Sequence, residues 1–463
     1  MHETGTNSEQ PHSVAAPEQK SEDQDVGGSS IDPEQPVSWV GRAFSSLRHR
    51  NYRLYFFGQM ISQTGSWVQI TALMWLAFEL THSNRWPAWI AGLHIFPTCL
   101  LGPWGGVLAD RLPKRWLIFW MQLCFMALSV VLAVLVLSGL VMPWHLLVLA
   151  AASGLVNAVD FPARLSFVME MVGRRDIMNA VGLNASLFNG ARAVGPAIGG
   201  LILVWIGPGW CFALNTVTYA GVLVGLARMD IAETAGTASS APGLKYVLEG
   251  FGYVLQKPRL AWLLVLVGAI GFFGWPYLSL MPAFAHDVLG VRERGYSVLL
   301  SATGFGALAA ALTVAASGSI ERRRALISTG VSTIAAMLLA LSISTRLDVA
   351  AVCCGLTGFG LILFFATSQS VVQLAAADHN RGRVMGVWSM VVSGAQPLGN
   401  FLAGPAADRW GEPIVLRTLG LACAVALFGM IALLWLSRGQ QVDVSDVETP
   451  IEAADIGIEA NRA

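Results

Sequence analysis

The charged residues that interrupt apolar stretches of this sequence are the ones whose types and spacing allow chemistry. Asp160 and Arg164 are four residues apart, so their side chains would be neighbours on a helix. Arg192 stands in the middle of a later apolar run. A charge in such surroundings is costly unless it meets a partner, water or a ligand. A buried carboxylate can bind and release a proton and a guanidinium can bind an anion, so these are the two kinds of chemistry to consider.

A further group of charges separates two apolar runs, residues 88–108 and 116–137. Its members are Asp110, Arg111, Lys114 and Arg115. Because about 20 apolar residues suffice to cross a bilayer as a helix, we predict a charged turn just outside the hydrocarbon between two spans. Glycines before this turn, Gly106 among them, remove side-chain bulk and would let a neighbouring helix approach closely.

The composition places the rest of the chain in a membrane as well. Of the 463 residues, 54% are hydrophobic and only 13% are charged, whereas soluble domains have about 25% charged residues. We therefore predict an all-α membrane protein whose helices position the charged residues within a lipid bilayer. Twelve transmembrane helices are expected, at residues 55–80, 88–108, 116–137, 146–165, 180–206, 211–227, 260–284, 298–316, 325–344, 349–374, 384–407 and 414–436.

A long gap after the sixth span divides the spans into two six-helix halves. In chain order we predict a disordered acidic tail, the first half, a cytoplasmic linker, the second half and a second acidic tail, at residues 1–38, 44–228, 229–259, 260–437 and 438–463. Lys and Arg are retained on the cytoplasmic side of a membrane, and most of them lie in segments on the same side as the N-terminus. Both termini are therefore predicted to be cytoplasmic.

Three motifs resemble those of the major facilitator superfamily of secondary transporters. The charged turn resembles motif A, through Gly106, Asp110, Arg111, Lys114 and Arg115. A glycine-rich segment resembles motif C, which marks drug–proton antiporters and exporters, through Gly190, Gly195, Pro196, Gly199 and Gly200. The sequence Asp160-x-Pro162-x-Arg164 resembles a feature of the branch that contains the enterobactin exporter and macrolide-efflux-like proteins.

This resemblance implies the major facilitator fold and a secondary active transporter. The implied function is export of a lipophilic small molecule, such as a drug, siderophore or secondary metabolite, across the cytoplasmic membrane, which is the inner membrane of a bacterium. Proton antiport with alternating access is the implied mechanism. The sequence departs from the drug–proton antiporters in one respect, because residues 146–159 contain no charge and the arginine of their motif B is absent. Motif C also has a purely structural interpretation, since glycine-rich membrane helices commonly pack closely.

Two interpretations stay open for each ionisable residue within a span. Asp160 is a proton carrier, or it belongs to a charge network with the arginines of the charged turn. Arg192 binds an anionic group of the substrate, or it pairs with Asp160 or with carbonyl groups. His94 is a hydrogen-bonded core residue or a proton relay. Glu79 is a solvated residue or a proton site that faces outward.

The substrate surface is expected among the amide and aromatic side chains of the spans, because an amide has little reason to face lipid. The candidates are Gln59, Gln63, Trp67, Gln369, Trp388 and Gln396. A cavity of this composition suits a lipophilic, weakly polar molecule.

No Walker A, H-E-x-x-H or G-x-S-x-G motif occurs in the sequence. We therefore expect no enzyme, no cofactor, no metal site and no nucleic-acid partner, and we expect an ion gradient, with protons as the coupling ion, to supply the energy. Two rival functions stay open. One is an importer or facilitator of a small metabolite, and the other is a non-transporting membrane receptor or scaffold.

Overall fold

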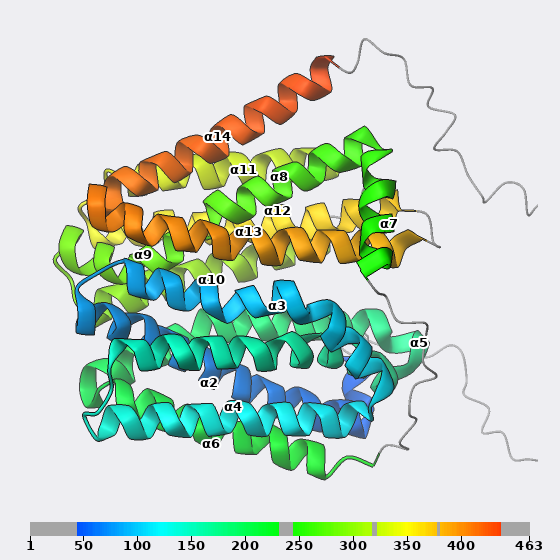
Figure 1. Cartoon of the computed structure of the whole chain (residues 1–463), viewed down its shortest axis with the longest axis horizontal. Helices are drawn as coiled ribbons and strands as arrows, with labels where there is room; N and C mark the ends of the chain where they lie inside the picture. The colour runs from blue at the N-terminus through cyan, green and yellow to red at the C-terminus, as the bar shows by residue number, and fades with distance from the viewer. Residues whose placement is uncertain (1–43, 231–243, 317–321, 377–379, 437–463) are drawn as a thin grey trace, which may run out of the picture. The chain divides into compact units, whose positions relative to one another are not determined.

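The computed structural model describes residues 44–230, 244–316, 322–376 and 380–436, which form long helices packed side by side (Figure 1). Both predicted acidic tails and the first part of the predicted linker lie outside the described residues. The helices of the first half are η1 (Ser45–Arg48), α2 (Arg50–Thr81), α3 (Arg85–Arg111), α4 (Lys114–Leu137), α5 (Pro143–Ile206) and α6 (Pro208–Ala227). Those that follow are α7 (Leu244–Leu255), α8 (Pro258–Gly274), α9 (Tyr277–Ala283), η2 (Phe284–Val288), α10 (Glu293–Ala316), α11 (Arg322–Leu341), α12 (Leu347–Ala375), α13 (Arg381–Trp410) and α14 (Glu412–Leu436).

The predicted all-α class is confirmed, and every predicted span overlaps a helix. Nine helices or helix segments of the described part are long and apolar enough to cross a membrane, and α3 is a tenth if its two bent pieces form one span. Helices α2 and α13 are as long, with 32 and 30 residues, but are not among these nine. Both carry several amide side chains, and α13 also begins and ends with charged residues, so their mean hydropathy is lower.

The fourth and fifth spans were predicted as separate helices, and α5 consists of two helices that meet at a kink at Gly173, whose φ of 68° is one that glycine readily adopts. The two spans are Pro143–Gly173 and Asn179–Ile206. One predicted boundary differs from the structure. The seventh predicted span is divided between α8 and α9. Pro276, which directly precedes α9, has no backbone N–H with which to continue the helical ladder of α8.

The most extensive contacts between the halves are made by two pairs of helices, α3 with α13 and α5 with α10 (Figure 1). Small residues allow both crossings. A Cβ atom added to Gly92 of α3 would overlap the ring of Phe401, and one added to Gly304 of α10 would overlap the backbone of Ala193. Close approach through glycine is the usual means by which membrane helices associate. The two crossings frame the space in which the candidate site lies.

Candidate functional site

A cavity of about 530 Å³ lies between the two halves. The first half lines it with side chains of α2, α3, α4, α5 and α6. The second half lines it with side chains of α9, α10, α13 and Trp275, which directly follows α8. Its volume lies in the range of about 300–1,000 Å³ that is usual for small-molecule sites. The arrangement can therefore enclose a ligand that touches both halves at once.

Several of the site residues predicted from the sequence line this cavity. They are Gln63, Trp67, His94, Arg164, Arg192, Pro196 and Gln396. Three other candidates do not. Gln59 is buried behind the cavity wall, where its Oε1 accepts a hydrogen bond from Arg164 Nη1 over 3.2 Å. Gln369 and Trp388 are half-buried in α12 and α13, away from the cavity lining.

Asp160 and Arg164 form an ion pair on one face of α5. The distance from Arg164 Nε to Asp160 Oδ2 is 2.8 Å, and Gln122 Nε2 donates a hydrogen bond to Asp160 Oδ1 over 3.2 Å. The Asp160 side chain has no exposed surface, whereas 12% of the Arg164 side chain is exposed. The carboxylate is thus held behind the arginine that faces the cavity. Neither the proposed network with the arginines of the turn nor a pair with Arg192 is formed.

Arg192 lies between two indole rings from opposite halves of the protein. Its Cζ atom is 5.0 Å from the ring centroid of Trp67 on α2 and 5.3 Å from that of Trp275. Cation–π contact with an indole stabilises a guanidinium. Among the described residues Arg192 has neither a hydrogen bond nor an ion pair, and it lines the cavity.

His94 and Glu79 differ in their surroundings. His94 faces the cavity, and its Nδ1 is 2.8 Å from the hydroxyl oxygen of Ser153 on α5. Ser153 also donates a hydrogen bond to the carbonyl oxygen of Ala150 over 2.8 Å. The histidine is therefore hydrogen-bonded, as a core residue would be, and still accessible from the cavity. Glu79 is exposed near the end of α2 and lies outside the cavity lining.

The charged turn between α3 and α4 connects helix ends within the first half. Lys114 forms an ion pair with Glu170 of α5. Arg115 donates hydrogen bonds to the carbonyl oxygens of Leu226 and Ala227 over 2.8 and 3.0 Å, and so caps the C-terminus of α6. Asp110 and Arg111 are exposed.

The glycines near the turn do not contribute equally to close packing. A Cβ atom on Gly105 would overlap the carbonyl group of Ala158 on α5, whereas one on Gly106 would have no heavy atom within 4 Å. Gly105, and not Gly106, therefore allows α3 and α5 to approach each other.

The glycine-rich segment of α5 packs on helices of both halves. A Cβ atom on Gly195 would overlap Trp67, and one on Gly199 would lie 3.2 Å from the Cα atom of Val68, so both glycines face α2. Gly200 faces Ser297 of α10 in the second half. Gly190 has no heavy atom within 4 Å of a Cβ position. Close packing is thus present at three of these glycines and absent at the fourth.

Several polar residues of the cavity were not selected from the sequence. They are Gln122, Asn157, Asn215, Ser279 and Asn400. Gln69 Oε1 accepts hydrogen bonds from Ser129 and Asn215 over 2.8 and 2.7 Å. Ser279 donates to Asn400 Oδ1 over 2.9 Å. The amide residues among them could have been predicted from the sequence, because an uncharged amide inside an apolar span has little reason to face lipid. The same reason led to the prediction of Gln63.

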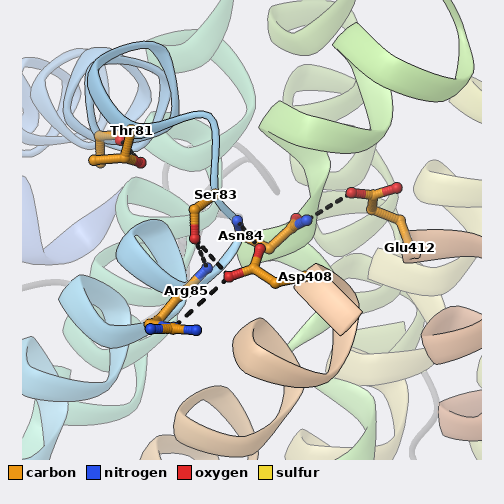
Figure 2. Close-up of polar contacts among 7 residues, drawn as sticks. Thr81, Ser83, Asn84, Arg85, Asp408 and Glu412 are labelled. Atoms are coloured by element: carbon orange, nitrogen blue, oxygen red, sulfur yellow. Dashed lines mark hydrogen bonds and ion pairs between the residues drawn. The ribbon is translucent and has the colours of Figure 1, made fainter. Parts of the chain in front are cut away.

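A polar cluster joins the two halves outside the cavity lining (Figure 2). Asp408 of α13 accepts hydrogen bonds from the Ser83 hydroxyl over 2.5 Å and from the Asn84 N–H over 2.6 Å, and Arg85 Nε is 3.7 Å from its carboxylate. Asn84 Nδ2 also donates to Glu412 Oε1 over 2.6 Å. We call these five residues the interhalf latch. It joins the segment between α2 and α3 to the junction of α13 and α14.

Gly182 and Gly190 in α5 and Gly386 in α13 have no heavy atom within 4 Å of a Cβ position. Within the described residues, no group of three or more His, Cys, Asp or Glu side chains could hold a metal ion. The site is therefore a chamber between two helical halves that is lined by amides, aromatic rings and two arginines.

Comparison with known proteins places this geometry among transporters. The family described as transmembrane secretion effector matches residues 41–456. The multidrug efflux pump Tap of Mycolicibacterium fortuitum is 27% identical over 407 residues, which cover 85% of this chain and 97% of that protein. The staphyloferrin A transporter of Staphylococcus aureus is 21% identical and covers 82% and 96% of the two chains. Macrolide efflux protein A of Streptococcus pyogenes is 23% identical, with coverages of 79% and 92%.

Solved structures with the same arrangement of helices are more distant in sequence. The nucleoside transporter NupG has a TM-score of 0.66 at 11% identity and covers 83% of this chain and 99% of its own. A transporter of the POT family has a TM-score of 0.67 at 11% identity, with coverages of 85% and 97%. At this level of identity the likeness concerns the fold alone.

Proposed function

The chain belongs to the transmembrane secretion effector family, and we propose that it exports a lipophilic small molecule across the cell membrane in exchange for protons. It is a multi-pass membrane transporter with the major facilitator fold. The cavity between the two halves is the observation that carries the proposal, because a substrate bound there is released to one side when the halves separate at that side. The relatives named for efflux of several drugs and of macrolides favour export.

The distribution of contacts between the halves supports alternating access. The interhalf latch joins the two halves at the end of the bundle that contains Ser83. Since Lys and Arg are retained in the cytoplasm, we assign the end with the Asp110–Arg115 turn and both termini to the cytoplasmic side. The described conformation is then one in which the halves are joined on the outer side, as a state that receives a substrate from the cytoplasm requires.

Transport into inverted membrane vesicles tests the direction. Inverted vesicles energised with a proton gradient would be incubated with a panel of lipophilic compounds of negative, zero and positive charge. An exporter accumulates its substrate in such vesicles, and the accumulation disappears when a protonophore removes the gradient. Efflux driven from preloaded vesicles would instead indicate an importer. If no compound moves in either direction, the protein is not a transporter of these compounds, and the receptor or scaffold interpretation is favoured.

Asp160 and Glu79 are the proposed proton carriers, because they are the carboxylates near the cavity and near the predicted outer end of α2. In proteoliposomes, we expect Asp160→Asn or Glu79→Gln to bind substrate but to lose substrate-linked proton movement, measured with a pH-sensitive dye inside the vesicles. Asp348→Asn is the matched control, since that carboxylate is 64% exposed at the start of α12. Normal proton exchange in both single variants and in the double variant would rule out these carriers.

A further inference from the structure

Arg192 gives the cavity a positive charge that the described residues do not neutralise. Within the part of the chain that the structure describes, the lining contains no acidic side chain, and its basic side chains are His94, Arg164 and Arg192. Arg164 is neutralised by Asp160 at 2.8 Å. Glu79 and the charged turn lie outside the lining. A guanidinium does not deprotonate in proteins, so the positive charge of Arg192 persists.

The two indole rings beside Arg192 determine which of its groups stay free. Trp67 and Trp275 lie at 5.0 and 5.3 Å from the guanidinium carbon. When a guanidinium stacks on a ring, it uses the faces of the planar group and leaves its N–H donors pointing outward in the plane. This edge matches the two oxygens of a carboxylate. A hydrogen-bond donor that is removed from bulk water and left unpaired costs free energy. A ligand that supplies acceptors to the Arg192 donors should therefore bind more tightly than one that does not.

We propose that Arg192 is the recognition site for a negatively charged oxygen group of the exported substrate, and that Trp67 and Trp275 position the guanidinium and cover the apolar part beside it. This inference rests on the proposed export function and narrows its substrate class to lipophilic organic acids. The three residues come from both halves, since Trp67 is on α2, Arg192 on α5 and Trp275 precedes α9. A bound acid therefore contacts both halves through one charge.

Matched pairs of compounds test the proposal. Purified protein in proteoliposomes would be assayed with a panel of aromatic carboxylic acids, the methyl ester of each acid, and cationic amines of similar size. The wild type is expected to transport the acids in preference to their esters. Arg192→Gln should reduce acid transport by about tenfold or more, as expected when a hydrogen bond to a charged group is lost, and should leave ester transport little changed. Arg192→Lys should fall between them because it keeps the charge but loses the planar edge.

The control is Arg346→Gln, which removes an exposed arginine at the start of α12 and should not change selectivity. Size-exclusion chromatography of each variant establishes that it is folded. The inference is overturned if the wild type prefers esters or amines, or if Arg192→Gln still transports acids at the wild-type rate. Those outcomes would leave export itself intact. A wild type that transports no compound of any charge would instead contradict the proposed function.

Discussion

The ion pair between Asp160 and Arg164 shows what a single charge requires inside this bundle. The carboxylate is fully buried, and its partners are Arg164 Nε at 2.8 Å and Gln122 Nε2 at 3.2 Å. Arg164 also donates a hydrogen bond to the Gln59 side-chain oxygen, and it lines the cavity. Removal of one partner from a buried pair typically costs about 3–5 kcal/mol, because the other charge is left uncompensated. The two partners differ in exposure, so the two deletions should differ in effect.

We expect Arg164→Gln to lower the thermal stability of the purified protein more than Asp160→Asn does. The first change leaves a buried carboxylate with one amide donor, whereas the second leaves an arginine that can turn toward the cavity. The double variant should recover part of the loss, since it contains no unpaired charge. Melting temperatures in detergent, followed by loss of the monodisperse peak, measure this order. Equal losses in the two single variants, or a double variant that is less stable than both, would contradict it.

The sequence was informative about which single residues matter and less so about their partners. The spacing of four residues on one helix predicted that Asp160 and Arg164 would be neighbours, and they are. The pair formed by Gln69 and Asn215 could not be predicted in this way, because 146 residues separate them and only the packing of α2 on α6 brings them together. For the same reason the indole rings around Arg192 were not foreseen as a pair.

At the scale of the helix, hydropathy predicted the existence of the spans better than their ends. The break between the fourth and fifth spans was predicted, and two helices do meet there, at the non-helical φ and ψ of Gly173. The break between α8 and α9 could have been predicted from Pro276, which cannot donate a backbone hydrogen bond. It was missed because the apolar residues continue on both sides of the proline.

Gly304 carries the crossing of α10 and α5, and we expect Gly304→Ala to impair transport and stability. The added Cβ atom would overlap the backbone of Arg192 and Ala193, which cannot rotate away as a side chain can. Overpacking of this kind typically costs about 1–3 kcal/mol. Gly182→Ala is the control, because it adds the same atom to a helical glycine of α5 that faces open space. Transport rates and melting temperatures of the two variants should diverge, and equal behaviour would contradict a tight crossing at Gly304.

At the scale of the whole transporter, the interhalf latch is the contact that must break if the cavity is to open at the Ser83 end. Asp408 alone accepts two hydrogen bonds from the segment between α2 and α3, and Glu412 accepts a third. Each contributes on the order of 1 kcal/mol, so the latch biases the equilibrium between the two openings without making it irreversible. A covalent bond at the same place would make the closure permanent.

We therefore expect a cross-link between Ser83→Cys and Asp408→Cys to stop transport, and a reductant to restore it. The background would be a variant in which the two cysteines that are not buried, Cys99 and Cys124, are replaced by alanine. Oxidation or a short thiol-reactive linker forms the bond, and uptake into inverted vesicles measures the rate.

The matched control for this cross-link joins two positions within the first half. The side chains of Ser45 and Asp176 are hydrogen-bonded over 2.8 Å, as closely as those of Ser83 and Asp408, but both belong to one half. Cysteines at Ser45 and Asp176 should cross-link without stopping transport, because the two halves can still move relative to each other. If the Ser83–Asp408 cross-link forms fully and transport continues, the end of the bundle at Ser83 does not open in the cycle, and the substrate must leave the cavity by another route.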